Sequence, residues 1–168
     1  MLIVSSLADA AGAYARMKPS RVISLLSEDE AAPLFPGLPP DRHLILYADR
    51  ESSAASIAEA ARGRARTLID FAGRWDSGCD ILIHCNRGVS RSTAAAYVIL
   101  CMREPQTPEA VLMRRLRAAA PHADPCPLLI TYADEILGRD GRMADALDDL
   151  SPPCAAMPAP LATVKVAA

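Results

Sequence analysis

The feature that most constrains the fold is an apolar run that passes through a glycine-containing loop into a second apolar run. Residues 80–84 have the length and composition of a buried strand. The loop at residues 85–91 contains Gly88, and residues 92–102 are expected to form a helix that stops before Pro105. Where such a helix begins, free amides and the positive end of the helix dipole point at one place. This pattern predicts an anion-binding loop.

The same alternation of short apolar runs and helical segments extends through the rest of the chain. Strands are expected over residues 1–7, 21–26 and 43–47, and helices over residues 9–17, 54–74, 107–120 and 128–137. Alternating strands and helices indicate an α/β fold. We expect a central, mostly parallel sheet of four or five strands, flanked by helices on both faces.

Length and composition fit one folded unit. The chain has 168 residues, of which 51% are apolar and 23% are charged, enough for a single substantial core. We place this domain, which is expected to be the catalytic one, at residues 1–150. Residues 151–168 are rich in alanine and proline and lack periodicity, so we expect a disordered tail there.

Charge and cysteine usage exclude several classes of function. The formal net charge of −2 provides no basic field that would recruit nucleic acid or an anionic membrane. The apolar runs are too short to span a bilayer, and no basic residue precedes the apolar N-terminus, so we expect a cytoplasmic protein without membrane insertion. The five cysteines form no CxxC pair, which argues against a zinc site. No metal or other cofactor is expected.

The loop carries the residues that chemistry on a phosphate group needs. Gly88 lets successive amides turn inward around one phosphate, and Arg91 can pair with two phosphate oxygens at once. Cys85 lies where the positive field favours a thiolate, in line to attack phosphorus. We expect the phosphate to be bound by Asn86, Arg87, Gly88, Val89, Ser90 and Arg91. Arg87 can also contact a second anionic group of a substrate.

Two neighbours of the loop are expected to assist it. The Ser92 hydroxyl can reach back to Cys85 and help the thiolate leave when a phosphocysteine is hydrolysed. His84 is expected to orient the loop through hydrogen bonds rather than to act as a base. Breaking a phosphate ester also requires a proton donor for the leaving oxygen.

The segment from Cys85 to Ser92 resembles the Cys-x5-Arg-Ser/Thr loop of protein tyrosine phosphatases. The version His-Cys-x-x-Gly-Val-Ser-Arg-Ser over residues 84–92, with the helix that follows it, is similar to the dual-specificity branch, and we expect a bacterial member. The resemblance is specific over residues 84–103. It implies a phosphocysteine intermediate, no metal, and a general-acid aspartate on a separate loop before the cysteine.

Asp49 fits the position that the resemblance implies for this acid. It follows the strand expected at residues 43–47 and precedes the long helix that leads to the cysteine strand. Other carboxylates remain open as alternatives: Asp41, Glu51, Asp70 and Asp76.

The leading hypothesis is therefore hydrolysis of phosphomonoesters. Phosphotyrosine in protein is the first substrate class to test, followed by phosphoserine and phosphothreonine, so a phosphorylated protein is the expected partner. Within the enzyme class, the alternative is a phosphoinositide or small-molecule phosphatase, although the loop lacks the lysines that related lipid phosphatases tend to carry. A poorly active phosphate-binding interaction protein is the alternative outside it. A sulfurtransferase is disfavoured because its loop lacks the Arg-Ser ending.

Overall fold

The computed structural model describes residues 1–48, 53–155 and 159–167. Its centre is a five-stranded sheet with strand order β3-β2-β4-β1-β5. The strands are β1 (Leu2–Ser6), β2 (Arg21–Ser27), β3 (His43–Ala48), β4 (Ile81–Cys85) and β5 (Ala162–Val164). β1 to β4 pair in parallel, and β5 pairs antiparallel with β1. The expected α/β class and mostly parallel sheet are confirmed.

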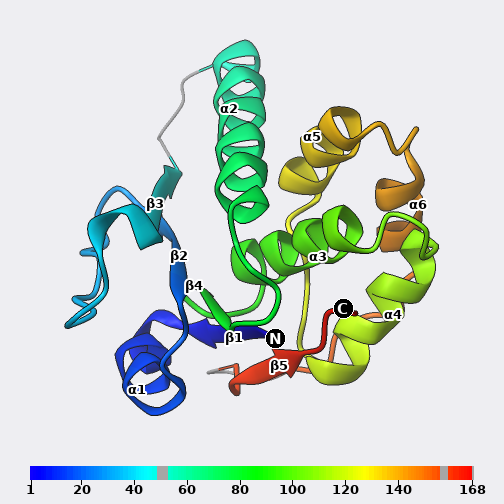
Figure 1. Ribbon diagram of the computed structural model, residues 1–168. Coiled ribbons are helices and arrows are strands. Elements are labelled where there is room, and N and C mark those ends of the chain that lie inside the picture. Colours follow the sequence, from blue (N-terminus) through cyan, green and yellow to red (C-terminus); the bar gives the residue numbers. More distant parts are fainter. Residues whose placement is uncertain (49–52, 156–158, 168) are drawn as a thin grey trace.

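Helices cover both faces of the sheet (Figure 1). They are α1 (Leu7–Met17), α2 (Ala54–Gly73), α3 (Arg91–Arg103), α4 (Glu109–Ala119), α5 (Pro127–Leu137) and α6 (Arg142–Asp148), with a short 3-10 helix at Pro40–Arg42. α1 packs on one face against a small cluster that includes Ile3, Val22 and Leu82. The larger core lies on the opposite face.

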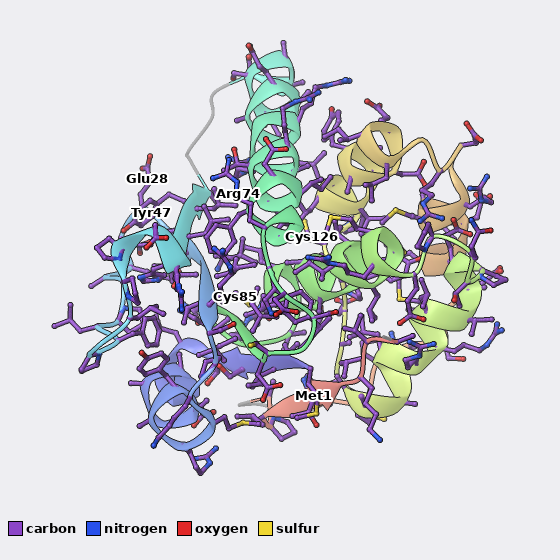
Figure 2. All side chains as sticks on the ribbon, viewed as in Figure 1. Met1, Glu28, Tyr47, Arg74, Cys85 and Cys126 are labelled. Carbon is purple, nitrogen blue, oxygen red and sulfur yellow. The ribbon has the colours of Figure 1, made fainter. Side chains whose placement is uncertain are left out.

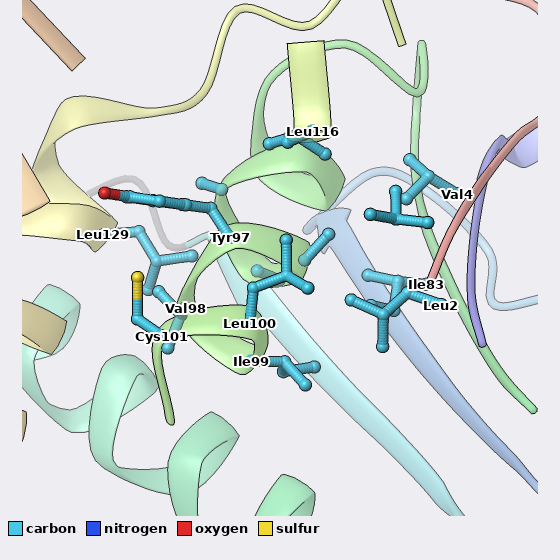
Figure 3. Close-up of a cluster of buried hydrophobic side chains, with 14 of the residues drawn as sticks. Leu2, Val4, Ile83, Tyr97, Val98, Ile99, Leu100, Cys101, Leu116 and Leu129 are labelled. Carbon is cyan, nitrogen blue, oxygen red and sulfur yellow. The ribbon is translucent and has the colours of Figure 1, made fainter. Parts of the chain in front are cut away.

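Helix α3 is the centre of that larger core. Its residues 92–101 are all buried: Leu100 lies on the side that faces the strand residues Leu2 and Ile83, whereas Tyr97 points away from them, towards Leu129 (Figure 3). A helix surrounded on all sides needs no polar face, which explains why residues 94–101 form an unbroken apolar run. Because α3 is fixed by packing along its whole length, the loop that precedes it has a rigid support.

Local signals in the sequence explain where two helices begin. The Ser6 side chain accepts a hydrogen bond from the backbone N–H of Asp9 at 3.2 Å, which caps α1 directly after β1. Ser53 and Ser56 form a reciprocal capping box at the start of α2. Helix α4, by contrast, begins after Pro108 without a side-chain cap.

The C-terminal region differs from the expectation of a disordered tail after residue 150. Residues 162–164 form β5, in which Ala162 and Val164 are buried against β1. Lys165 and Ala167 continue this docking, since the Lys165 carbonyl accepts from Arg115 at 3.5 Å and the Ala167 amide donates to Glu104 at 2.9 Å. The disordered-tail prediction is therefore wrong for these residues. Helix α6 was also not expected from the sequence.

Candidate active site

Cys85 is the last residue of β4, which lies between β1 and β2 in the sheet. It is only 3% exposed, and its Sγ lies 3.2 Å from the Ser92 Oγ in the first turn of α3. In parallel sheets, ligands bind outside the carboxyl ends of the strands. The structure thus brings together the thiol and the hydroxyl that the sequence paired, at the edge of the sheet where a ligand is expected.

The loop between Cys85 and Arg91 is pressed against the end of β1. Gly88 has φ +73°, and a Cβ at this position would lie 2.8 Å from the Ser6 nitrogen and 2.9 Å from the Ser5 carbonyl carbon. The backbone N–H of Leu7 also donates to the Asn86 carbonyl at 3.0 Å. Only glycine combines this conformation with this close approach. The sequence prediction that Gly88 shapes the loop is therefore supported by a specific steric reason.

The segment that leads into α5 holds the other side of the loop. The Val89 carbonyl accepts from the Asp124 amide at 3.0 Å, and the Ser90 carbonyl accepts from the Cys126 amide at 3.3 Å. The buried His122 ring donates a hydrogen bond to the Gly88 backbone, although burial still lowers the pKa of this histidine. With several carbonyls engaged on the outside, the loop conformation is fixed from both flanks.

Arg91 is held by Ser27, the last residue of β2, and by Glu30, which follows that strand. Its Nη1 donates to the Ser27 hydroxyl at 3.2 Å, and its Nη2 lies 3.7 Å from a carboxylate oxygen of Glu30. The guanidinium is partly exposed, with 27% of the side chain accessible. Arg91 is thus positioned by contacts on one side while it remains accessible to a ligand.

Glu30 is a site residue that the sequence prediction missed. Its side chain is 10% exposed, accepts from the Ser27 amide at 2.6 Å and also accepts from the Asn86 side-chain amide. The Glu30 carboxylate therefore contacts Asn86 at the start of the loop, Arg91 at its end and Ser27 at the end of β2. Its position 56 residues before Asn86 carries no local motif, so nothing in the sequence pointed to it.

The environment keeps Glu30 ionised. Burial acts to raise the pKa of this carboxyl, but the hydrogen bonds from Ser27 and Asn86 and the charge of Arg91 outweigh it and lower the pKa. A carboxyl with a lowered pKa is a poor proton donor at neutral pH. Glu30 is thus suited to positioning Arg91 rather than to acting as the acid.

His84 lies on the opposite face of β4 from Cys85 and is fully buried. Its Nε2 lies 2.6 Å from the Ser24 Oγ, which in turn lies 2.7 Å from the His43 Nε2. Burial, followed by the nearby charge of His43, lowers the pKa of His84 to about 4. The hydrogen-bond partner of His84 Nε2 is Ser24 on the neighbouring strand β2, so the expected role of His84 in orienting the loop stays a prediction.

Three of the alternative acids lie at the amino ends of the strands, away from Cys85. Asp41 lies in the 3-10 helix that leads into β3, Asp70 lies towards the end of α2, and Asp76 follows that helix and accepts from the Gly78 amide. The Arg21 side chain at the start of β2 contacts the Asp41 and Arg74 carbonyls, which places this region at the amino ends of the strands. These carboxylates are therefore at the end of the sheet opposite to Cys85.

Asp49 and Glu51 lie outside the described residues. Ala48, the last described residue before them, ends β3 and pairs in register with Ser27. The carboxyl edge of the sheet also holds described carboxylates that the sequence prediction did not consider, among them Asp29 after β2 and Asp124 beside the loop. Both are exposed. These two residues are the appropriate comparisons for any test of Asp49.

Arg87 is exposed on the loop. Within residues 1–48, 53–155 and 159–167, no cluster of three or more His, Cys, Asp or Glu side chains is arranged to hold a metal ion. Across the same described ranges, no helix combines the length and apolar character needed to cross a bilayer.

Comparisons with known proteins bear on the fold. No protein-family profile matches the chain, and no curated protein matches it. Several solved structures do match the chain. They include PTP-2 phosphatase of Cydia pomonella, with 20% identity and a TM-score of 0.58 over 80% of this chain and 84% of that one. DUSP15 matches with 18% identity and a TM-score of 0.59 over 89% and 92% of the two chains.

A third similar structure is PTPMT1, solved in complex with PI(5)P, with 14% identity and a TM-score of 0.58 over 83% of this chain and 94% of that one. Each match extends over most of both chains, so the likeness concerns the whole α/β architecture and not only the loop. Identities at this level establish a shared fold. The chain therefore has the fold of the dual-specificity and protein tyrosine phosphatase structures.

Proposed function

We propose that this protein is a cysteine-dependent protein phosphatase that acts on phosphotyrosine, with phosphoserine and phosphothreonine as further substrates. The observation that carries the proposal is the arrangement of Cys85, Arg91 and Ser92 around one fixed loop at the carboxyl end of β4. The fold shared with known phosphatases supports it.

In the proposed reaction, the Cys85 thiolate attacks phosphorus and the bond to the leaving oxygen breaks. The loop amides and Arg91 stabilise the charge on the equatorial oxygens. Asp49 gives its proton to the leaving oxygen, then accepts a proton from the water that hydrolyses the phosphocysteine. The Ser92 hydroxyl, already 3.2 Å from the sulfur, donates a hydrogen bond to the departing thiolate.

The site chemistry favours this function over the two alternatives. A phosphoinositide substrate is supported by the likeness to a structure solved with PI(5)P, but residues 85–92 contain no lysine. A phosphate-binding interaction protein would not need a thiol, an arginine and a serine in catalytic order. One set of assays separates the proposed function from both alternatives.

The test is hydrolysis of an aryl phosphate and a phosphotyrosine peptide without added metal. Cys85→Ser should abolish turnover, while Cys79→Ser, at an exposed cysteine, should leave it unchanged. Arg91→Lys should reduce kcat/KM by about 10²-fold or more, because lysine cannot form the two-pronged contact. Full activity in Cys85→Ser would reject the mechanism. Hydrolysis of a phosphoinositide but of no phosphopeptide would favour the lipid alternative.

The role of Asp49 needs a separate comparison. Asp49→Asn should slow hydrolysis more for an alkyl phosphate than for an aryl phosphate, because poor leaving groups depend on the proton donor. Asp29→Asn and Asp124→Asn should not show this dependence on the leaving group. If one of them shows it and Asp49→Asn does not, the acid is reassigned to that residue.

A further inference from the structure

A row of side chains extends sideways from the nucleophile across the sheet. In the strand register, Cys85 of β4 lies beside Leu25 of β2, and Leu25 lies beside Leu46 of β3. Directly paired residues of parallel strands point to the same face of the sheet. On the side of β2 and β3, the neighbours of the thiol on its own face are therefore aliphatic side chains that lead towards the edge strand, whereas Ser6 of β1 lies on its other side.

A cavity of about 180 Å³ lies along this row. β2 and β3 form its floor, α2 forms one wall and the start of α5 forms the other, with Cys126 at the position marked in Figure 2. The lining includes Leu25, Leu46, Ala61, Leu128 and Leu129, together with Arg91. Arg91 therefore borders both the phosphate loop and an aliphatic cavity.

The size and chemistry of this cavity indicate what it accepts. The cavity opens partly to solvent, since Leu128 in its lining is 38% exposed, so a ligand can enter it. A closed apolar cavity of about 150 Å³ binds benzene and stays free of water. Arg64 and Arg91 both line the cavity, and the other lining residues are apolar. A ligand that joins an anionic group to a hydrocarbon group satisfies both parts.

We infer that this cavity is a subsite for the hydrocarbon part of a phosphomonoester, placed beside the phosphate by Arg91. The inference rests on the proposed function in one respect, namely that phosphate binds at the loop of residues 85–91. It adds a substrate preference: phosphate esters whose alcohol carries a short aliphatic chain or ring bind better than esters of small polar alcohols.

The test uses methylphosphonate and hexylphosphonate, which cannot be hydrolysed, with binding measured by calorimetry. Each buried methylene is worth ~0.8 kcal/mol, or about fourfold in Kd, so partial burial of the longer chain should tighten binding at least about tenfold. Equal Kd values for the two phosphonates would overturn the inference while the proposed function stands. Binding of hexylphosphonate by a protein that hydrolyses no phosphomonoester would support the subsite and reject the proposed function.

A filling variant locates the effect. Ala61→Leu puts a larger side chain into the cavity from the buried face of α2, and leucine keeps the helix propensity of alanine. It should remove the preference for hexylphosphonate and leave the Kd of methylphosphonate unchanged. The matched control is Ala55→Leu, on the exposed face of the same helix, which should retain the preference.

A second variant covers the case in which Ala61→Leu does not fold. Leu128→Ala removes lining atoms at a position that is 38% exposed, so the free energy of unfolding should fall only slightly. It should weaken the binding of hexylphosphonate several-fold without affecting methylphosphonate. A hexylphosphonate preference that survives both substitutions would place the hydrocarbon elsewhere and overturn the inference.

Discussion

Gly88 combines a left-handed conformation with backbone contact to β1, so its substitution tests how the loop is built. Gly88→Ala should lower the free energy of unfolding by at least about 2 kcal/mol, because the strained φ and the contact with Ser6 act together. Gly63→Ala is the control, since no atom lies within 4 Å of its Cβ position in α2. This control should gain about 0.5–1 kcal/mol. Urea unfolding measures both changes, and equal changes in the free energy of unfolding of the two variants would contradict the steric account.

Glu30 contributes through Arg91 and Asn86 rather than by contact with the reacting atoms. Glu30→Gln removes the charge that faces the guanidinium, and we expect KM for an aryl phosphate to rise about tenfold. The pH profile of kcat should keep its shape, because Glu30 is not the proton donor. Glu28→Gln, at an exposed neighbour, is the matched control and should behave as wild type. A changed acidic limb in Glu30→Gln would instead identify this carboxyl as the acid.

The buried His84 predicts how stability depends on pH. Its pKa is lowered from 6.5 to about 4 in the folded protein, so the unfolded chain binds a proton more readily. This contribution to stability is complete above pH 6.5 and is lost as the pH falls towards 4. Around pH 5, His84→Gln should reduce the slope of unfolding free energy against pH by about 1.4 kcal/mol per unit. An unchanged slope would show that His84 is not held neutral.

At the scale of elements, the sequence predicted best where the signals are local. The strand, loop and helix from β4 to α3 were expected to within one residue at each junction, because a buried strand, a required glycine and an apolar helix are adjacent in sequence. Short elements that depend on distant partners were missed. β5 has three residues within an alanine- and proline-rich segment, and it exists through pairing with β1.

The docking of β5 is testable by paired substitutions. Val164 is buried and Thr163 is exposed in the same strand, so Val164→Asp and Thr163→Asp place the same charge in opposite environments. Val164→Asp should lower the free energy of unfolding by about 3 kcal/mol or more, because an unpaired carboxylate would be buried. Thr163→Asp should cost well under 1 kcal/mol. Thermal or urea unfolding checks this, and similar losses would argue against the strand.

At the scale of the whole molecule, the sheet topology explains why the site has more parts than its motif. The carboxyl ends of β1, β2 and β4 meet at one edge, which brings Ser6, Ser27 and Glu30 to a loop that is distant in sequence. The motif identified Cys85 and Arg91, because their spacing within the loop is fixed. Glu30 and the aliphatic cavity arise from the packing of separate elements, so no local pattern could reveal them.

The central claim is that Cys85 carries the phosphate during turnover. The direct measurement is rapid acid quenching with a radiolabelled phosphotyrosine peptide, followed by identification of the labelled segment. Ser92→Ala should accumulate more label than wild type, because the departing thiolate loses its hydrogen bond. We predict label on the peptide that contains Cys85 and none in Cys85→Ser. Turnover by Ser92→Ala with no label on Cys85, or label retained in Cys85→Ser, would contradict the account.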